Sequence, residues 1–396
     1  ANWLHNGGGL GLNIEGQNMR AFVWDGGIAR ETHQEYDGAG GENRVTVEDS
    51  GSLNFHAAHV MGTVVASGFL PDAKGMAPQA KASAYDWTSD EAEAAEAAAN
   101  RGMLLSNHSY GHRANAIPDF WFGAYLEDAR NWDQIMFDAP YYVAVLSAGN
   151  DGNNNGANSV PLDGNSAYDK LNGNKTSKNS IVVANGQDAD IDSEGNLVSV
   201  VINSGSSEGP TDDYRIKPDI TGNGTALFSS YESADDAYNT ISGTSMSAPN
   251  ITGSLLLLQQ YHSERNGSLM YAATLKGLIL HTADDVDGSA GLEGPDAVYG
   301  WGLMNTKRAA ETIRDEGLNS YIQELTINDG ETLTFTVRSD DVNDLRQHKI
   351  YANTQNNNTT LHHSNMNENS NEQQSTSNNE NNMNNYYKQQ YINNNY

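Results

Sequence analysis

The feature that most constrains the fold is a regular exchange of short apolar runs and helical patterns over residues 20–312. The apolar runs lack the strict alternation of half-exposed strands, so they suit strands that are covered on both faces. Strands joined through helices form parallel sheets. We therefore predict an α/β fold with a mostly parallel sheet flanked by helices. The predicted strands are Met19–Trp24, Lys81–Asp86, Met103–Ser106, Tyr141–Leu146, Ser180–Ala184 and Leu197–Ile202.

Two segments between these runs have clear helical signatures. Residues 90–101 are rich in alanine, and Thr88 and Glu91 have the spacing of a capping box. Gly102 can end this helix in the left-handed conformation. Residues 246–261 contain four consecutive leucines, so we expect a helix that runs through the core.

The pattern changes after about residue 315. Apolar and polar residues alternate over 321–338 around the turn sequence Asn328-Asp329-Gly330, which predicts a β-hairpin. We therefore divide the chain into a large α/β domain, 1–315, and a small β-rich C-terminal domain, 316–396. In residues 351–396, 17 of 46 residues are Asn. Residues 346–396 are thus a low-complexity segment of doubtful identity, from which we infer no function.

Charge and composition exclude several classes of function. Acidic residues number 51 against 22 basic ones, and the net charge of −29 disfavours nucleic acid and anionic membranes as partners. The absence of cysteine removes disulfides, thiol nucleophiles and cysteine-ligated zinc. No apolar run approaches the ~20 residues that span a bilayer. The 39 glycines and many Asn/Asp-rich loops fit a secreted, extracellular protein, although an acidic cytosolic enzyme could share them.

Two candidate residues follow the first predicted strand. Asp25 comes directly after an apolar run and before two glycines, at the strand end where open α/β sheets place their sites. An ordinary turn aspartate would have the same context. His56 opens an apolar helical stretch and lies three residues before His59. Such a pair could bind a metal or consist of core histidines with satisfied hydrogen bonds.

Two further candidates lie later in the chain. Ser245 belongs to a run of small residues that leads into the apolar helix, so its hydroxyl lies at a helix N-terminus. An N-cap serine is the simpler explanation. Ser247 replaces the second glycine of a G-x-S-x-G elbow, which argues against an α/β-hydrolase. Asn150 ends another apolar run, where its amide could donate to an oxyanion or simply form a turn.

Taken together, these four segments resemble the subtilisin-like serine proteases in order, spacing and local sequence over roughly residues 15–312. The family has its triad in the order Asp, His, Ser, with the oxyanion asparagine between His and Ser, as in this sequence. Further segments agree with the family pattern. They are Gly75–Pro78, Asn107–Gly111, Ser206–Thr211, Lys217–Ile220 and Tyr299–Gly302.

The resemblance implies a serine endopeptidase that forms an acyl-enzyme. Ser245 would be the nucleophile, His56 the general base and Asp25 the residue that orients it. Asn150 and the Ser245 N–H would form the oxyanion hole. The implied substrate-binding residues are Ser109, Tyr110, Gly111, Ala148 and Gly149. A catalytically silent peptide-binding module and a metal-dependent hydrolase using His56, His59, His108 and His112 are the alternatives.

The resemblance also implies binding partners, although the sequence departs from the family pattern at several positions. We expect protein or peptide substrates, a monomer, no organic cofactor and at least one structural calcium with unassigned ligands. Residues 188–192 and 284–287 are candidate calcium loops, although neither is complete. The usual calcium loop after the histidine helix is too short here. Gly26 stands where the family usually has threonine or serine, and Tyr110 replaces a common leucine on the substrate segment. The aromatic run 120–122 is a candidate rim of the cleft.

Overall fold

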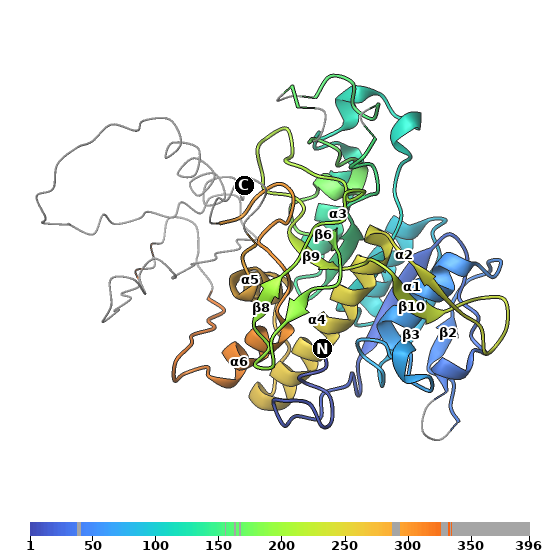
Figure 1. Ribbon diagram of the computed structural model, residues 1–396, viewed down its shortest axis with the longest axis vertical. Coiled ribbons are helices and arrows are strands. Elements are labelled where there is room, and N and C mark those ends of the chain that lie inside the picture. Colours follow the sequence, from blue (N-terminus) through green and yellow to red (C-terminus); the bar gives the residue numbers. More distant parts are fainter. Residues whose placement is uncertain are drawn as a thin grey trace, which may run out of the picture.

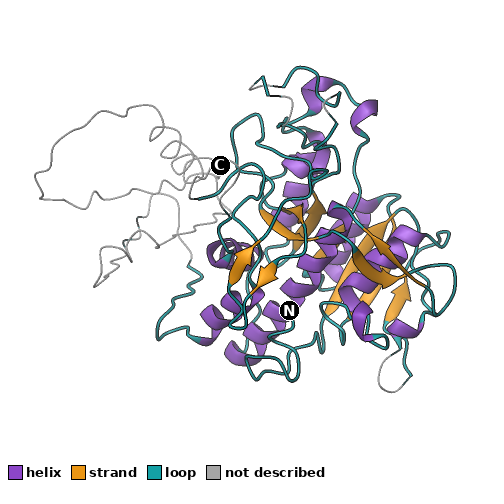
Figure 2. Ribbon diagram, viewed as in Figure 1, coloured by secondary structure: helices purple, strands orange, loops and turns teal. Residues whose placement is uncertain are grey.

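The computed structural model describes residues 1–37, 41–154, 156–161, 164–165, 168–286 and 294–325, together with Thr332 and Thr334. Within these residues the centre is a seven-stranded sheet in the order β2-β3-β1-β4-β5-β6-β9, with every neighbouring pair parallel (Figures 1 and 2). The predicted α/β class is confirmed. The strands are β1 (Arg20–Asp25), β2 (Val45–Val47), β3 (Lys81–Asp86), β4 (Leu105–His108), β5 (Val143–Ser147), β6 (Ile181–Gly186) and β9 (Ile220–Asn223).

Helices cover both faces of this sheet. In the chain, α1 lies between β2 and β3, and α2 lies between β3 and β4. These two helices pack against different neighbouring helices. Helix α3 packs beside α2, and α4 packs beside α1. The helices are α1 (Phe55–Val65), α2 (Asp90–Asn100), α3 (Glu127–Asp138), α4 (Thr244–Asn266), α5 (Ala272–Thr282) and α6 (Thr306–Arg314).

Helix α4 runs through the core, as predicted. It contacts β1, β4, β5, β6 and β9 of the sheet as well as α1, α5 and α6. Its four consecutive leucines, Leu255–Leu258, are completely buried, because partners surround this part of the helix on every side. No helix in the described part of the chain is long and apolar enough to cross a membrane.

Smaller elements connect this framework. Two antiparallel hairpins lie outside the central sheet: β7 (Asp190–Ile191) with β8 (Leu197–Ser199), and β10 (Leu227–Ser230) with β11 (Tyr238–Ile241). The prediction of Leu197–Ile202 as a strand of the main sheet is therefore wrong, because its first half pairs locally with β7. The 3₁₀ helices are η1 (Gln34–Tyr36), η2 (Pro71–Ala73), η3 (Ala114–Ala116), η4 (Asp119–Trp121) and η5 (Gly173–Thr176).

The ends of α2 and the predicted C-terminal hairpin differ in part from the predictions. The predicted capping box of α2 is wrong: Ser89 is the N-cap in the left-handed conformation, and Thr88 Oγ1 donates instead to Asp86 Oδ1 at 2.6 Å. Gly102 does adopt the predicted left-handed conformation, with φ of 64°. Residues 321–325 of the predicted C-terminal hairpin form no strand. Apart from Thr332 and Thr334, the part of the predicted domain after residue 325 lies outside the described residues.

The strand order determines at which edge of the sheet a functional site can form. Strand β1 lies between β3 and β4, so the chain leaves β1 toward one side of the sheet and β4 toward the other. In open α/β sheets such a reversal opens a crevice at the carboxyl ends of the strands. The register pairs Trp24 with His108 and His108 with Leu146, which brings the ends of β1, β4 and β5 to one edge.

Candidate active site

Asp25 and His56 form a hydrogen-bonded pair at this edge. Asp25 is the last residue of β1, and the side chain of Asn54 caps α1 by accepting from the His56 N–H at 2.7 Å. The cap fixes His56 in the first turn of α1. Its Nδ1 lies 2.8 and 2.9 Å from the two carboxylate oxygens of Asp25. The Asp25 side chain is 3% exposed and that of His56 25%, so the imidazole is the partner that reaches the surface.

The carboxylate determines the protonation of the imidazole. Burial alone would lower the pKa of His56, but the hydrogen bond that Nδ1 donates to Asp25 and the charge of that carboxylate together outweigh burial and raise the pKa. Because Nδ1 faces Asp25, the remaining proton of the neutral ring stays on Nδ1. Nε2 is then the nitrogen that is free to accept a proton.

Ser245 occupies the first turn of α4. Gly243 precedes the helix with φ of 156° and ψ of 165°, a conformation that essentially only glycine adopts. Ser245 is 8% exposed, and its Oγ donates to the Ser109 carbonyl at 3.0 Å. In return, Ser109 Oγ donates to the Ser245 carbonyl at 2.9 Å. This reciprocal pair fixes the start of α4 to the segment that follows β4.

Asn150 is held against the same helix start. It lies three residues after β5, and its Oδ1 accepts from the Thr244 N–H at 2.9 Å. The neighbouring Gly149 N–H donates to Thr244 Oγ1 at 3.1 Å. With Oδ1 committed to Thr244, the other end of the amide, Nδ2, is the group that can donate to a ligand. A Cβ at Gly243 would lie 3.4 Å from Asn150 Oδ1, an ordinary van der Waals distance, so the positive φ and not the available space favours glycine here.

The predicted substrate-binding residues form two segments beside Ser245. Ser109, Tyr110 and Gly111 directly follow β4, whereas Ala148 and Gly149 directly follow β5. Because β4 and β5 are neighbouring parallel strands, both segments leave the sheet at the same edge. The Tyr110 side chain is tied down: its hydroxyl donates to Asp90 Oδ2 at 2.6 Å and lies 2.7 Å from His108 Nδ1.

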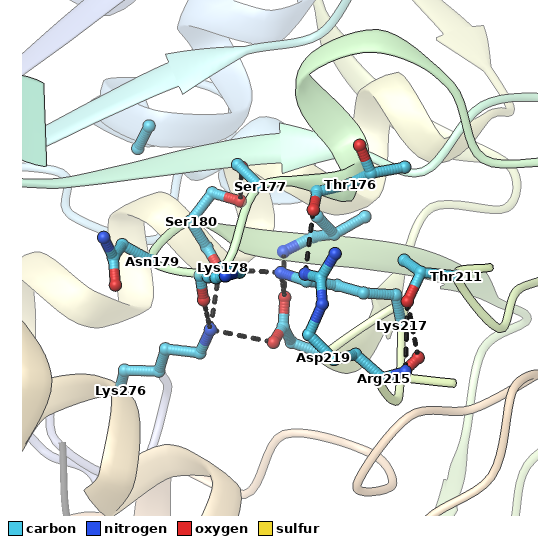
Figure 3. A network of polar contacts seen from close by, with 12 residues as sticks. Thr176, Ser177, Lys178, Asn179, Ser180, Thr211, Arg215, Lys217, Asp219 and Lys276 are labelled. Carbon is cyan, nitrogen blue, oxygen red and sulfur yellow. Dashed lines mark hydrogen bonds and ion pairs between the residues drawn. The ribbon is translucent and has the colours of Figure 1, made fainter. Parts of the chain in front are cut away.

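The loop after η5 is anchored by a buried ion cluster. Nζ of Lys217 and Nζ of Lys276 lie 2.5 and 2.9 Å from the two carboxylate oxygens of Asp219 (Figure 3). Both ammonium groups also donate to the Ser180 carbonyl, at 3.0 and 2.8 Å. Burial would raise the pKa of Asp219, but the two lysines outweigh burial and lower it. The cluster therefore fixes the loop 176–180 to β6 and β9.

A comparison with known protein families shows to which family the chain belongs. A family model described as the Subtilase family matches residues 24–302, which include every candidate residue above. The chain belongs to the subtilase family. It is therefore a serine protease, and its substrates are proteins or peptides.

Solved structures share the fold of this subtilase at low sequence identity. The patellamide maturation protease PatA is 21% identical with a TM-score of 0.55, over 76% of this chain and 98% of PatA. The CspB protease of Clostridium perfringens is 16% identical with a TM-score of 0.59, over 76% and 96% of the two chains. The prenylagaramide maturation protease PagA is 20% identical with a TM-score of 0.53, over 75% and 94%. These likenesses establish the fold.

The structure of the subtilase adds Trp87 to the site, a residue that sequence reasoning missed. Trp87 follows β3, and its N–H donates to the Asp25 carbonyl at 2.8 Å. Its ring is 49% exposed and lies over Gly26, where a Cβ would come within 2.8 Å of the ring. A side chain at position 26 would therefore require the exposed Trp87 ring to shift. An aromatic residue directly after a predicted strand, at the edge that carries Asp25, was the available signal.

The histidines of the metal-dependent alternative have separate partners. His59 Nε2 lies 2.9 Å from the Leu227 carbonyl, and burial lowers its pKa to about 4. His108 Nε2 lies 2.7 Å from Ser106 Oγ, and burial lowers its pKa to about 3. His112 Nε2 contacts Asp128 at 2.6 Å. Within the described residues, no three histidine or acidic side chains form a group that could hold a metal ion.

The two candidate calcium loops use their carboxylates in other ways. Asp192 accepts from the N–H groups of Glu194 and Asn196 at 2.9 and 2.8 Å, which closes the β7–β8 turn. Asp284 forms an ion pair with Arg308 at 2.9 Å. Asp287, the end of the second loop, lies outside the described residues. The residues that the structure describes in these loops do not form a calcium ligand set, so calcium stays a prediction without assigned ligands.

Proposed function

We propose that this subtilase is a secreted endopeptidase in which Ser245 is the nucleophile, His56 the general base and Asp25 the residue that orients it. The observation that carries the proposal is the contact of His56 Nδ1 with both oxygens of the buried Asp25 carboxylate. This contact holds one imidazole tautomer and stabilises the cation that forms during catalysis. Secretion is proposed from composition, since the chain has 39 glycines and many Asn/Asp-rich loops.

The hydroxyl of Ser245 must turn before it reacts. In the free protein it donates to the Ser109 carbonyl. The proposed mechanism requires rotation about χ1 that replaces this bond with one to His56 Nε2. Hydrogen bonds of free enzymes often tighten only once substrate is bound. Ser245 Oγ then attacks the peptide carbonyl while Nε2 takes its proton, and His56 passes this proton to the leaving amine. Water releases the acyl group by the same steps.

The oxyanion of the intermediate needs preorganised donors. Asn150 Nδ2 and the Ser245 N–H, which lies in the first turn of α4, are the two candidates. Removal of one such donor costs roughly 3 kcal/mol in the transition state. A catalytically silent peptide-binding module would keep the same cleft, so turnover distinguishes the two functions.

The experiment that tests this function is the pH dependence of hydrolysis of an internally quenched peptide. His56 must be neutral to accept a proton, so kcat/KM should fall as pH decreases through its pKa. Asp25 raises this pKa, and the midpoint should therefore lie above the ordinary histidine value of 6.5. A profile that is flat from pH 5 to 9 would contradict a histidine base, and absence of turnover at every pH would favour the silent module.

Asn150 allows a sharper test of the oxyanion role. Asn150→Ala should lower kcat by roughly a hundredfold or more with little change in KM, because the oxyanion exists only after attack. The same substitution also removes the acceptor for the Thr244 N–H, so a matched variant is needed. Asn150→Asp keeps that acceptor and removes the donor. If Asn150→Asp had the kcat of the wild type, Asn150 would only cap α4.

A further inference from the structure

Lys175 places a buried cation against the substrate-binding segment. It belongs to η5, which packs against α3 and β5. Its Nζ donates to the Tyr110 carbonyl at 3.1 Å. A Cβ at Gly111 would overlap the same Nζ, so the absence of a side chain at Gly111 makes room for the ammonium group. The lysine therefore contacts two of the three residues that follow β4.

The charge of Lys175 lacks a close counterion. The residue is 3% exposed, and burial lowers its pKa to about 8, although attraction to Asp151 and Asp128 opposes this effect. The ammonium group is thus mostly protonated at neutral pH. No carboxylate in the described part of the chain lies within 4.0 Å of it. An ammonium has three donors, and the Tyr110 carbonyl uses one of them.

Other buried lysines of the chain have more hydrogen-bond or ion-pair partners than Lys175. Lys217 and Lys276 share Asp219, and Lys170 donates to two carbonyls, those of Asn154 and Ala157, at 2.7 and 2.8 Å. These three lysines hold loops in place. Burying a cation whose N–H donors lack acceptors costs folding free energy, and an acceptor that bonds those donors reduces this cost. Lys175 has one such bond in the described part of the chain, to the Tyr110 carbonyl.

The position of Lys175 indicates which part of the substrate it meets. Residues 109–111 and 148–150 flank Ser245 from two sides, through the Ser109–Ser245 pair and through the bonds of Gly149 and Asn150 to Thr244. If Ser245 attacks as proposed, the residue before the cleaved bond carries the attacked carbonyl and must therefore lie next to Ser245 and these two segments. Helix η5 contacts β5, the strand that leads into residues 148–150, and its Lys175 donates to the Tyr110 carbonyl.

We propose that Lys175 is a specificity-determining residue that selects Asp or Glu immediately before the cleaved bond. The inference rests on the proposed function, because it assumes attack by Ser245. A substrate carboxylate would accept the donors that Lys175 does not use, in a site where the ammonium is already desolvated. The net charge of −29 slows the approach of acidic peptides, but salt screens this long-range repulsion and leaves a buried pair nearly intact. The selection should therefore persist, and become clearer, at higher ionic strength.

The test compares two peptides that differ only in Glu or Gln before the cleaved bond. The ratio of their kcat/KM values cancels the titration of His56 and any general loss of activity. We expect the wild type to favour Glu by at least about tenfold, the difference between a charge-assisted and a neutral hydrogen bond. Lys175→Met should bring the ratio to about one or below. Lys170→Met, which removes a buried lysine bonded only to carbonyls, should leave the ratio unchanged.

Labelling of Ser245 by a fluorophosphonate separates this proposal from the proposed function. If the serine is labelled but the wild type cleaves both peptides equally, the selection by Lys175 is wrong while the protease mechanism stands. If Lys175→Met slows both peptides equally and keeps the preference for Glu, Lys175 only supports Tyr110 and the proposal is also overturned. An unlabelled serine without turnover would overturn the proposed function, and the selection with it. Should Lys175→Met fail to fold, the wild-type ratio alone still decides.

Discussion

Ser245→Ala is expected to lower kcat for peptide hydrolysis by roughly a million-fold, the loss typical of a catalytic nucleophile whose triad acts as a unit. The fold should persist, because alanine fits the first turn of α4 and the Ser245 carbonyl still accepts from Ser109 Oγ. The measurement is turnover of a quenched peptide, with the melting temperature as a check of folding.

Ser247→Ala is the matched control for this variant. Ser247 lies two residues further along α4, is completely buried and donates to the Gly222 carbonyl at 2.8 Å. Its loss removes a buried hydrogen bond at a cost of about 1 kcal/mol in stability. The kcat of Ser247→Ala should stay close to that of the wild type. If Ser245→Ala retained even a tenth of the wild-type rate, the assignment of the nucleophile would be wrong.

Asp25→Asn is expected to lower kcat by roughly ten-thousandfold. The amide is nearly isosteric with the carboxylate, but its NH₂ group can face Nδ1 and move the ring proton to Nε2. The nitrogen that should accept the serine proton is then blocked. Loss of the negative charge also removes the cause of the raised His56 pKa. We therefore expect both a lower plateau and a lower midpoint in the pH profile of kcat/KM.

The neighbouring strand supplies the control for Asp25→Asn. Asp86 ends β3 in register with Asp25, and it bonds Thr88 rather than an imidazole. Asp86→Asn changes the charge at the same sheet edge by the same amount. Its kcat should stay within a few-fold of the wild type. Equal losses in both variants would mean that general charge, and not the contact with His56, accounts for the effect of Asp25→Asn.

The sequence predicted the framework of the site because the framework depends on local patterns. Buried parallel strands require continuous apolar runs, and β3 begins and ends at the predicted residues, Lys81 and Asp86. The positions of Asp25, His56 and Ser245 follow from elements whose ends are marked by glycine, asparagine or small residues. Such marks can be read from the chain itself.

Other features depend on contacts that no local pattern records. The apolar run 197–202 suits a core strand, but the turn closed by Asp192 pairs its first residues in a surface hairpin. Lys175 lies in a polar stretch without apolar periodicity, and only the approach of Tyr110 and Gly111 buries it. Trp87 reaches the site because β3 neighbours β1. Each of these features needs the tertiary arrangement.

Locating the residue that a fluorophosphonate labels covalently tests directly whether Ser245 is the activated nucleophile. The labelled protein is digested, and the modified residue is located by mass spectrometry. We expect one label per chain, on Ser245, formed more slowly in Asp25→Asn and abolished in Ser245→Ala. A label on another residue, or labelling of Ser245 at the same rate when His56 is replaced by alanine, would contradict an activated serine at this site.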